Sequence, residues 1–259
     1  DISVRNAILV SFHEQFFPYL AETQFLRHLF SALSDECFDV RLQAVQLLCR
    51  LLELNPSIIL PVMRREFVMF IDNISAKEQD IQVEGLKLLA MVATHAPDIV
   101  MKFLGGVTPC LLSMLTNTPR NAPITLPLLE TIAATAEAVG PALNHNGVSN
   151  LAVSRVCDIL GSLSFDKSIQ TVRKKGLRAI AAVIQHCGET ICPYKTHPTL
   201  CKLLTSIVLN KDECHECRIE ALRIVGIVGA LDPHKVDALQ LEATEGGTGT
   251  HADGAYGEM

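Results

Sequence analysis

One sequence pattern recurs five times along the chain. Each copy has a first position, a second position three residues later, and a helix-ending proline or glycine twelve residues after that, as in Arg41, Ala44 and Pro56. The first positions are Arg41, Gln82, Thr125, Arg173 and Arg218. They lie 41, 43, 48 and 45 residues apart, a mean of about 44. A period of this length indicates a tandem array of small structural units and argues against one large core.

Apolar spacing inside a copy predicts two helices. In the clearest copy the first helix has apolar residues at i, i+3, i+4 and i+7, which are Leu26, Leu29, Phe30 and Leu33. The second helix has the same spacing at Val40, Ala44, Leu47, Leu48 and Leu51. Asn55-Pro56 then ends the helix, because proline disfavours helical geometry in the residue before it.

The other copies give the same helix pairs. First (A) helices are predicted at about 57–73, 98–116, 149–163 and 196–209, and second (B) helices at about 79–94, 124–139, 168–186 and 215–230. Pro123 and Pro127 predict a late start or a kink for the B helix near 124–139. Because periods of about 40–47 residues built from helix pairs are typical of HEAT and armadillo arrays, we predict an all-α, HEAT/armadillo-type α-α superhelix of about five to six helix pairs.

The composition along the chain predicts its organisation. Residues 1–24 fit a partial HEAT unit, and residues 25–242 fit the HEAT-repeat solenoid. Residues 243–259 are rich in Gly, Thr, Ala and acidic side chains without apolar periodicity, so we predict a disordered tail or loop there.

Three local expectations concern the helices. Small residues recur at one helical position, so close helix approach is expected at Ala44, Gly85, Gly176 and Ala221. Ser75 and Glu78 have the spacing of a capping box before a B helix. In the last B helix the apolar stripe that should face the core consists of Ile219, Leu222 and Val225.

Charge and composition exclude several functions. The net charge of −6 gives no support for nucleic-acid binding. The short basic cluster Arg173-Lys174-Lys175 is explained as a solvated helix face. No apolar run is long enough for a membrane span. Nine cysteines, mostly inside apolar helical patterns, indicate reduced thiols and no disulfide framework.

The best metal-like spelling in the chain is Cys214-His215-Glu216-Cys217. Zinc needs four ligands and this CxxC supplies two, so Cys187 and Cys192 are the further candidates for a zinc-binding module around residues 186–217. The simpler interpretation is that residues 214 and 217 mark the start of the last B helix, and no metal site is predicted. A redox role is disfavoured because the usual βαβ context is missing.

No catalytic constellation is found. Nucleophile-elbow, Walker and kinase catalytic-loop motifs are missing from the sequence, so the chain is not predicted to be an enzyme by itself and no catalytic or cofactor-binding residue is assigned. Arrays of helix pairs generally present extended surfaces to partner proteins, although one sequence does not identify the partner-binding residues.

Two stretches are more specific than a general helical repeat. The first comprises Leu33-Ser34-Asp35-Glu36, Phe38, Val40-Arg41, Asn55-Pro56 and Pro61. The second comprises Pro193-Tyr194, Pro198-Thr199-Leu200, Arg218, Glu220-Ala221, Arg223, Gly229-Ala230-Leu231-Asp232-Pro233 and Lys235. Over roughly residues 25 to 236 the chain resembles the N-terminal HEAT region of the target of rapamycin (TOR) serine/threonine protein kinases, which are phosphatidylinositol 3-kinase-related kinases. It departs from that pattern at Cys214 to Cys217, where the family has other polar residues.

The resemblance implies a scaffold. In that family HEAT solenoids precede a kinase domain, support dimerisation and bind accessory subunits, in growth and nutrient signalling. ATP and magnesium belong to the kinase domain, so no cofactor is implied for this segment. The implied partners are a TOR-complex accessory subunit and a second copy of the kinase. The implied location is cytoplasmic, with attachment to endomembrane or lysosome/vacuole surfaces through partners.

Two alternatives remain open from the sequence. The chain could belong to a HEAT adaptor of another family, such as a transport receptor or a phosphatase scaffold, and kinase motifs far downstream in the same reading frame would decide against that. The other alternative is the zinc-binding regulatory module, which metal analysis of purified protein would test.

Overall fold

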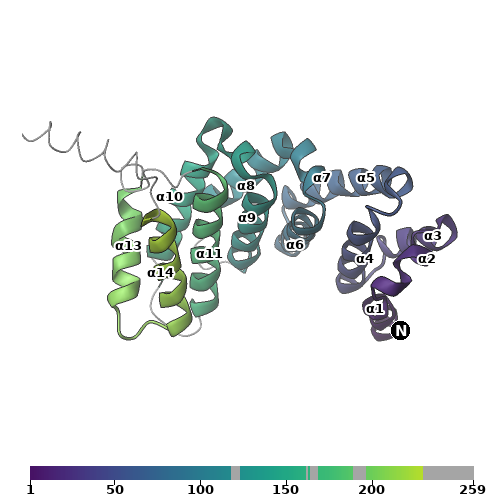
Figure 1. Cartoon of the computed structure of the whole chain (residues 1–259), viewed down its shortest axis with the longest axis horizontal. Coiled ribbons are helices and arrows are strands. Elements are labelled where there is room, and N and C mark those ends of the chain that lie inside the picture. Colours follow the sequence, from purple (N-terminus) through teal and green to yellow (C-terminus); the bar gives the residue numbers. More distant parts are fainter. Residues whose placement is uncertain (118–122, 162, 164–168, 189–196, 230–259) are drawn as a thin grey trace, which may run out of the picture.

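The helices of the chain alternate between two layers (Figure 1). The computed structural model describes residues 1–117, 123–161, 163, 169–188 and 197–229, and every regular element in those ranges is a helix. The B layer contains α1 (Ile2–Ser11), α4 (Phe38–Leu51), α6 (Gln79–His95), α9 (Thr125–Val139), α11 (Gln170–His186) and α14 (His215–Gly229). The A layer contains α3 (Thr23–Ala32), α5 (Pro56–Ile74), α7 (Pro97–Lys102), α8 (Leu104–Asn117), α10 (Val148–Gly161) and α13 (Pro198–Leu209). Short helical segments, η1 (Glu14–Phe16), α2 (Phe17–Leu20) and η2 (Gly140–Gly147), join them.

Packing runs from each unit to the next. From α1 to α11, each B helix packs against the following B helix, and each B helix from α4 onward packs against an A helix of its own unit. The buried side chains form one continuous apolar core along the described part of the chain. The predicted all-α, HEAT/armadillo-type superhelix is therefore confirmed, whereas the predicted tail at 243–259 lies outside the described residues.

The clearest unit has the core that its apolar spacing predicts. Leu26, Leu29 and Leu33 of the first helix are buried, and Phe30 is partly buried. All five stripe residues of α4, including Leu48 with no exposed surface, are buried as well. A leucine buried in this way contributes about 1.5–3 kcal/mol relative to an exposed one.

In two units the polar first position of the repeat closes the turn between the two helices. Arg41 Nη1 donates a hydrogen bond to the carbonyl oxygen of Asp35 at 2.8 Å. Gln82 Nε2 donates in the same way to the carbonyl oxygen of Ala76 at 2.7 Å. In both units the acceptor lies six residues before the donor, so the recurring side chain satisfies a carbonyl that the helices leave unpaired.

The small residues of the repeat lie where helices of one unit approach closely, as predicted. A Cβ atom added to Gly176 of α11 would lie 2.6 Å from Cδ2 of Leu160 in α10. One added to Gly85 of α6 would lie 3.1 Å from the backbone nitrogen of Ile74 in α5. Ala44 and Ala221, at the same position in other units, have no exposed surface.

The stripe predicted for the last B helix is wrong. Ile219, Leu222 and Val225 are 50%, 54% and 47% exposed, and the buried residues of α14 include Cys217, Ala221, Ile224 and Val228. In α11, Leu177 and Ile180 occupy the positions that match Leu222 and Val225, 45 residues earlier in the chain. Both are buried, and α11 packs against α14. Periodicity identified an apolar face on α14, but among the described residues no helix covers that face.

Three smaller expectations also differ from the structure. Ser75 Oγ bonds back to the carbonyl oxygen of Ile71, and the N-cap Glu78 makes no side-chain capping bond, so the predicted capping box does not form. The A helix expected at 98–116 ends at Lys102 and resumes at Leu104. Pro127 lies in the first turn of α9, where a missing N–H costs no helical hydrogen bond.

Candidate protein-binding surface

Polar contacts join each pair of neighbouring B-layer helices. Near the N-terminus Arg5 Nε lies 2.8 Å from Asp35 Oδ2, and the next junction contains the Arg41–Glu84 ion pair. Between α6 and α9, Thr131 Oγ1 donates to the carbonyl oxygen of Leu86 at 2.9 Å. Further contacts connect Lys175 to Glu130 at 2.8 Å and Arg178 to Glu220 at 2.7 Å. Exposed ion pairs of this kind contribute only about 0–1 kcal/mol each to the free energy of unfolding. Their main effect is therefore on the orientation of neighbouring units.

The pair at the N-terminal junction perturbs the titration of Asp35. The backbone N–H of Cys37 donates to this carboxylate, and the Arg5 guanidinium lies beside it. Both contacts favour the ionised form, so the pKa of Asp35 is lowered below its ordinary value. The junction between α1 and α4 therefore depends on an ionised carboxylate.

An open groove crosses four helices of the B layer. Its volume is about 530 Å³, and its walls come from α4, α6, α9 and α11. Phe38, Leu42 and Met91 give it apolar surface, while Lys87 and Glu137 add charge. Lys87 Nζ lies 5.4 Å from the centre of the Phe38 ring, a cation–π arrangement. A surface with apolar area between charges of both signs suits a peptide or helix of a protein partner.

A second cleft lies between the units of α4 and α6. It has a volume of about 550 Å³ and is lined by the turn after α3 and by α4, α5 and α6, including Met69 and Phe70 of α5. Arg41 and Glu84 in its wall pair with each other, and Arg65 pairs with its neighbour Glu66. This cleft spans one junction only, so the four-helix groove is the stronger candidate for a partner surface.

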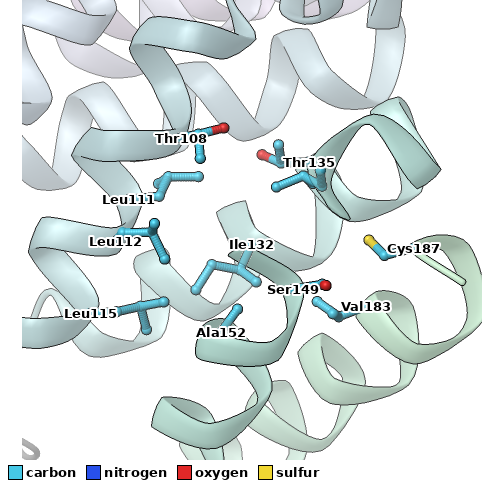
Figure 2. Close-up of a pocket in the computed structure, with 11 residues that line it drawn as sticks. Thr108, Leu111, Leu112, Leu115, Ile132, Thr135, Ser149, Ala152, Val183 and Cys187 are labelled. Carbon is cyan, nitrogen blue, oxygen red and sulfur yellow. The ribbon is translucent and has the colours of Figure 1, made fainter. Parts of the chain in front are cut away.

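The void of Figure 2 is too small for an organic ligand. Its volume is about 20 Å³, which is roughly the space that one water molecule needs. Its exposed lining is almost entirely apolar and comes from α8, α9, η2, α10 and the end of α11. Thr135, one of its polar residues, donates its hydroxyl proton to the carbonyl oxygen of Thr131 at 2.7 Å. The void is therefore a packing defect between units.

A buried ion pair joins α11 to the turn before α14. Arg173 Nη1 lies 2.8 Å from Oε1 and 2.7 Å from Oε2 of Glu213, and both side chains are almost fully buried. The predicted solvated face for Arg173-Lys174-Lys175 is therefore wrong at Arg173, and Lys174 and Lys175 are partly buried partners of Glu216 and Glu130. Sequence reasoning missed this pair because a basic triplet usually indicates a solvated face.

The cysteines of the CxxC lie together at the start of α14. The thiol sulfurs of Cys214 and Cys217 and a carboxylate oxygen of Glu213 all lie within 4.8 Å of one another. Cys217 is fully buried, and burial raises the pKa of its thiol. Glu213 already accepts from Arg173 and from the backbone N–H of Cys214, so this carboxylate offers little to a metal ion.

The structure does not bring Cys187 to this pair. Cys217 contacts Gln170 at the first turn of α11, whereas Cys187 follows the last turn and lines the void of Figure 2. A helix of 17 residues separates these ends by about 25 Å. Cys192, the fourth candidate ligand, lies outside the described residues. Two of the four residues considered for zinc are therefore adjacent, and a third is far away.

Comparison with known proteins gives sequence relatives over most of the chain. The family model described as the serine/threonine-protein kinase mTOR domain matches residues 190–255. The target of rapamycin homolog of Caenorhabditis elegans is 29% identical over 245 residues, which are 91% of this chain and 9% of that protein. The serine/threonine-protein kinase TOR of Arabidopsis thaliana is 28% identical over 240 residues, which are 90% of this chain and 9% of that protein. The chain thus spans about a tenth of the length of these relatives.

Solved structures share the fold at low sequence identity. An engineered protein has a TM-score of 0.57 and 15% identity, covering 87% of each chain. A designed armadillo repeat protein in complex with the peptide (KR)4 has the same TM-score and identity, covering 86% of this chain and 90% of its own. No helix among the described residues is long and apolar enough to cross a membrane. The chain is therefore a helical-repeat protein of the armadillo/HEAT type that is similar in sequence, over about nine-tenths of its length, to target of rapamycin serine/threonine protein kinases.

Proposed function

We propose that the chain is a non-catalytic scaffold segment of a TOR-type serine/threonine protein kinase. In this role it supports the architecture of the kinase dimer and binds an accessory subunit in growth and nutrient signalling. The observation that carries the proposal is the open groove across α4, α6, α9 and α11, on a stack whose cores are filled by packing between neighbouring units. ATP and magnesium would act in a kinase domain outside this segment, at a cytoplasmic location or at endomembrane or lysosome/vacuole surfaces reached through partners.

The groove supports a protein partner more than a small molecule. It is about 530 Å³ in volume, open along its length and spread over three junctions between units. Small-molecule sites are usually more enclosed and bury most of their ligand. An amphipathic helix could place apolar side chains near Phe38 and Met91 and opposite charges near Lys87 and Glu137.

Charge reversal in the groove tests the proposal in the intact protein. The variant Lys87→Glu with Glu137→Lys keeps the net charge and changes both signs along the groove. We expect less accessory subunit to co-purify, with unchanged phosphorylation of a small peptide substrate, because no catalytic group has been altered. The matched control is Lys102→Glu with Asp98→Lys, which reverses two exposed charges on α7 in the other layer.

The result is decided by subunit recovery and crosslinks. Crosslinks from the accessory subunit to residues of α4, α6 or α9 that are lost in the groove variant would support the proposal. Full recovery of every subunit by the groove variant, with crosslinks confined to other surfaces, would overturn the partner-binding part. The role in dimer architecture needs a separate test. It is the mass of the complex in solution, measured for a variant in which the contact between the two kinase copies is weakened.

A further inference from the structure

Two cysteines lie at the start of α14 in an asymmetric arrangement. Cys214 precedes the helix and is partly exposed, whereas Cys217 is fully buried one turn later. The backbone N–H of Cys217 donates to the sulfur of Cys214 at 3.2 Å. The outer cysteine is thus accessible to a reagent and the inner cysteine is shielded from it.

The distance between the two cysteines allows a covalent bond. Their sulfur atoms lie within 4.8 Å of each other. The backbone N–H of Arg218 donates to the carbonyl oxygen of Cys214 at 3.2 Å, so the backbone from 214 to 218 already forms a helical turn. Residues three apart in such a turn have Cα atoms about 5 Å apart, inside the range of disulfides. The described part of the chain has no strands and therefore no βαβ unit, but two cysteines three residues apart at a helix start have the spacing of a CxxC dithiol.

Metal binding is the less favoured use of the same residues. Glu213, the third potential ligand, accepts two short bonds from the buried guanidinium of Arg173, whose positive charge also repels a cation. Two sulfurs then remain, whereas zinc in a structural site takes four ligands. The contacts therefore favour chemistry between the two sulfurs.

We propose that Cys214 and Cys217 form a redox-active dithiol that is oxidised to a disulfide by a small-molecule disulfide such as glutathione disulfide. The Cys214 thiolate attacks one sulfur of the oxidant, forming a mixed disulfide and releasing one glutathione thiolate. Cys217, after losing its proton to solvent or to that thiolate, attacks the sulfur of Cys214 and releases the second glutathione. Two protein thiols are oxidised and one glutathione disulfide is reduced to two glutathione molecules.

The disulfide would alter the junction between α11 and α14. In the reduced protein the thiol of Cys217 donates to the carbonyl oxygen of Gln170, at the first turn of α11, with a separation of 3.7 Å. A disulfide sulfur has no proton, so Gln170 loses this donor. The buried Arg173–Glu213 pair lies beside the two cysteines. Oxidation should therefore weaken the contacts that join α11 to the start of α14. The dithiol thereby connects the redox state to the geometry of the stack.

The test measures thiols in the intact protein across glutathione buffers from reduced to oxidised. After alkylation and trypsin digestion, both cysteines lie in one peptide, residues 212–218, because cleavage follows Lys211 and Arg218. We expect both cysteines of this peptide to become inaccessible to alkylation together. The oxidised peptide should be lighter than the same peptide with two free, unalkylated thiols by two hydrogen atoms. Cys37 and Cys110, which are also partly exposed, serve as internal controls and should keep their alkylation sites.

Single variants distinguish the order of the two steps. Cys217→Ser should accumulate a glutathione mixed disulfide at Cys214, because the resolving thiol is gone. Cys214→Ser should leave Cys217 reduced, because that thiol is fully buried. Cys201→Ser is the matched control and should oxidise like the unchanged protein. Since α14 could be disturbed by a serine at 217, its helicity is checked by hydrogen exchange before the comparison.

Two outcomes would overturn the proposal. One is that Cys214 and Cys217 keep their alkylation sites in the most oxidised buffer, as Cys110 does. The other is that the purified protein binds zinc at one ion per chain and that both Cys214→Ser and Cys217→Ser release it, which would assign the pair to a metal site. Oxidation of the unchanged protein with mixed disulfide trapped only in Cys217→Ser would support the dithiol.

Discussion

Arg173 and Glu213 are 40 residues apart in the chain and form a two-bond ion pair inside the junction between α11 and α14. The guanidinium comes from the first position of one repeat, and the carboxylate comes from the turn of the next repeat. Because both charged groups are buried and bond to each other, the pair fixes how the two units meet. It belongs to the series of polar contacts that join successive helices of the B layer.

Removing one charge of this pair should destabilise the junction strongly. We expect Glu213→Gln to lower the free energy of unfolding of the last two units by about 3–5 kcal/mol, because it removes the carboxylate charge that is paired with the buried Arg173 guanidinium. Hydrogen exchange of amides in α11 and α14 measures this locally. Lys174→Gln, which alters a more exposed pair, is the control and should cost no more than about 1 kcal/mol. A loss below about 1 kcal/mol for Glu213→Gln would show that the pair does not hold the junction.

Two leucine variants distinguish the buried core from the exposed apolar stripe of α14. Leu48→Ala should cost about 2–5 kcal/mol, because Leu48 is fully buried in α4. Leu222→Ala should cost no more than about 0.5 kcal/mol in this chain, because more than half of that side chain is exposed. Urea unfolding of both variants gives the comparison. Equal losses at the two positions would contradict the burial pattern.

Two glycines should respond to alanine in opposite directions. Gly176→Ala places a methyl group 2.6 Å from Cδ2 of the buried Leu160, so we expect a loss of about 1–3 kcal/mol from overpacking. Gly226→Ala, in the same kind of B helix, meets no atom within 4 Å and should gain about 0.5–1 kcal/mol through helix propensity. Thermal unfolding of the two variants measures the difference. A stabilised Gly176→Ala protein would refute the close approach of α10 and α11.

The N-terminal junction should weaken in acid. Hydrogen bonds from Cys37 and Arg5 lower the pKa of Asp35 below its ordinary value of 3.8. Its contribution is therefore complete above that value and is lost as pH falls through the lower pKa of the folded state. We expect faster hydrogen exchange at the start of α4 as the pH falls below 3.8, and Asp35→Asn should show the faster exchange already at neutral pH. An Asp35→Asn protein with unchanged exchange would contradict this assignment. Asp39→Asn, at the exposed start of α4, is the control.

Much of the fold could be predicted because helix periodicity and helix breakers are local properties. The stripe around Leu48 and the small residues at Gly85 and Gly176 follow from spacing alone. The stripe at Leu222 was mispredicted because spacing shows that a face is apolar without showing what covers it. The pairing of Arg173 was missed because its partner comes from another unit, although the recurrence of polar first positions was a usable signal.

The candidate surface was harder to predict than the fold. Phe38, Lys87 and Met91 lie on three turns of two different helices, so only the stacking of α4 on α6 brings them to one groove. The CxxC was visible in the sequence, but its relation to Gln170 and Arg173 was not. Contacts between units decide these sites, and one sequence specifies such contacts only through the fold.

The most direct test of the scaffold account is hydrogen exchange of the intact protein with and without its accessory subunit. The account predicts slower exchange in the subunit-bound protein at residues of α4, α6, α9 and α11 that line the groove, with little change in α5 or α8 of the other layer. Protection confined to the other layer, or no protection anywhere in the chain, would contradict the assignment of this surface to a protein partner.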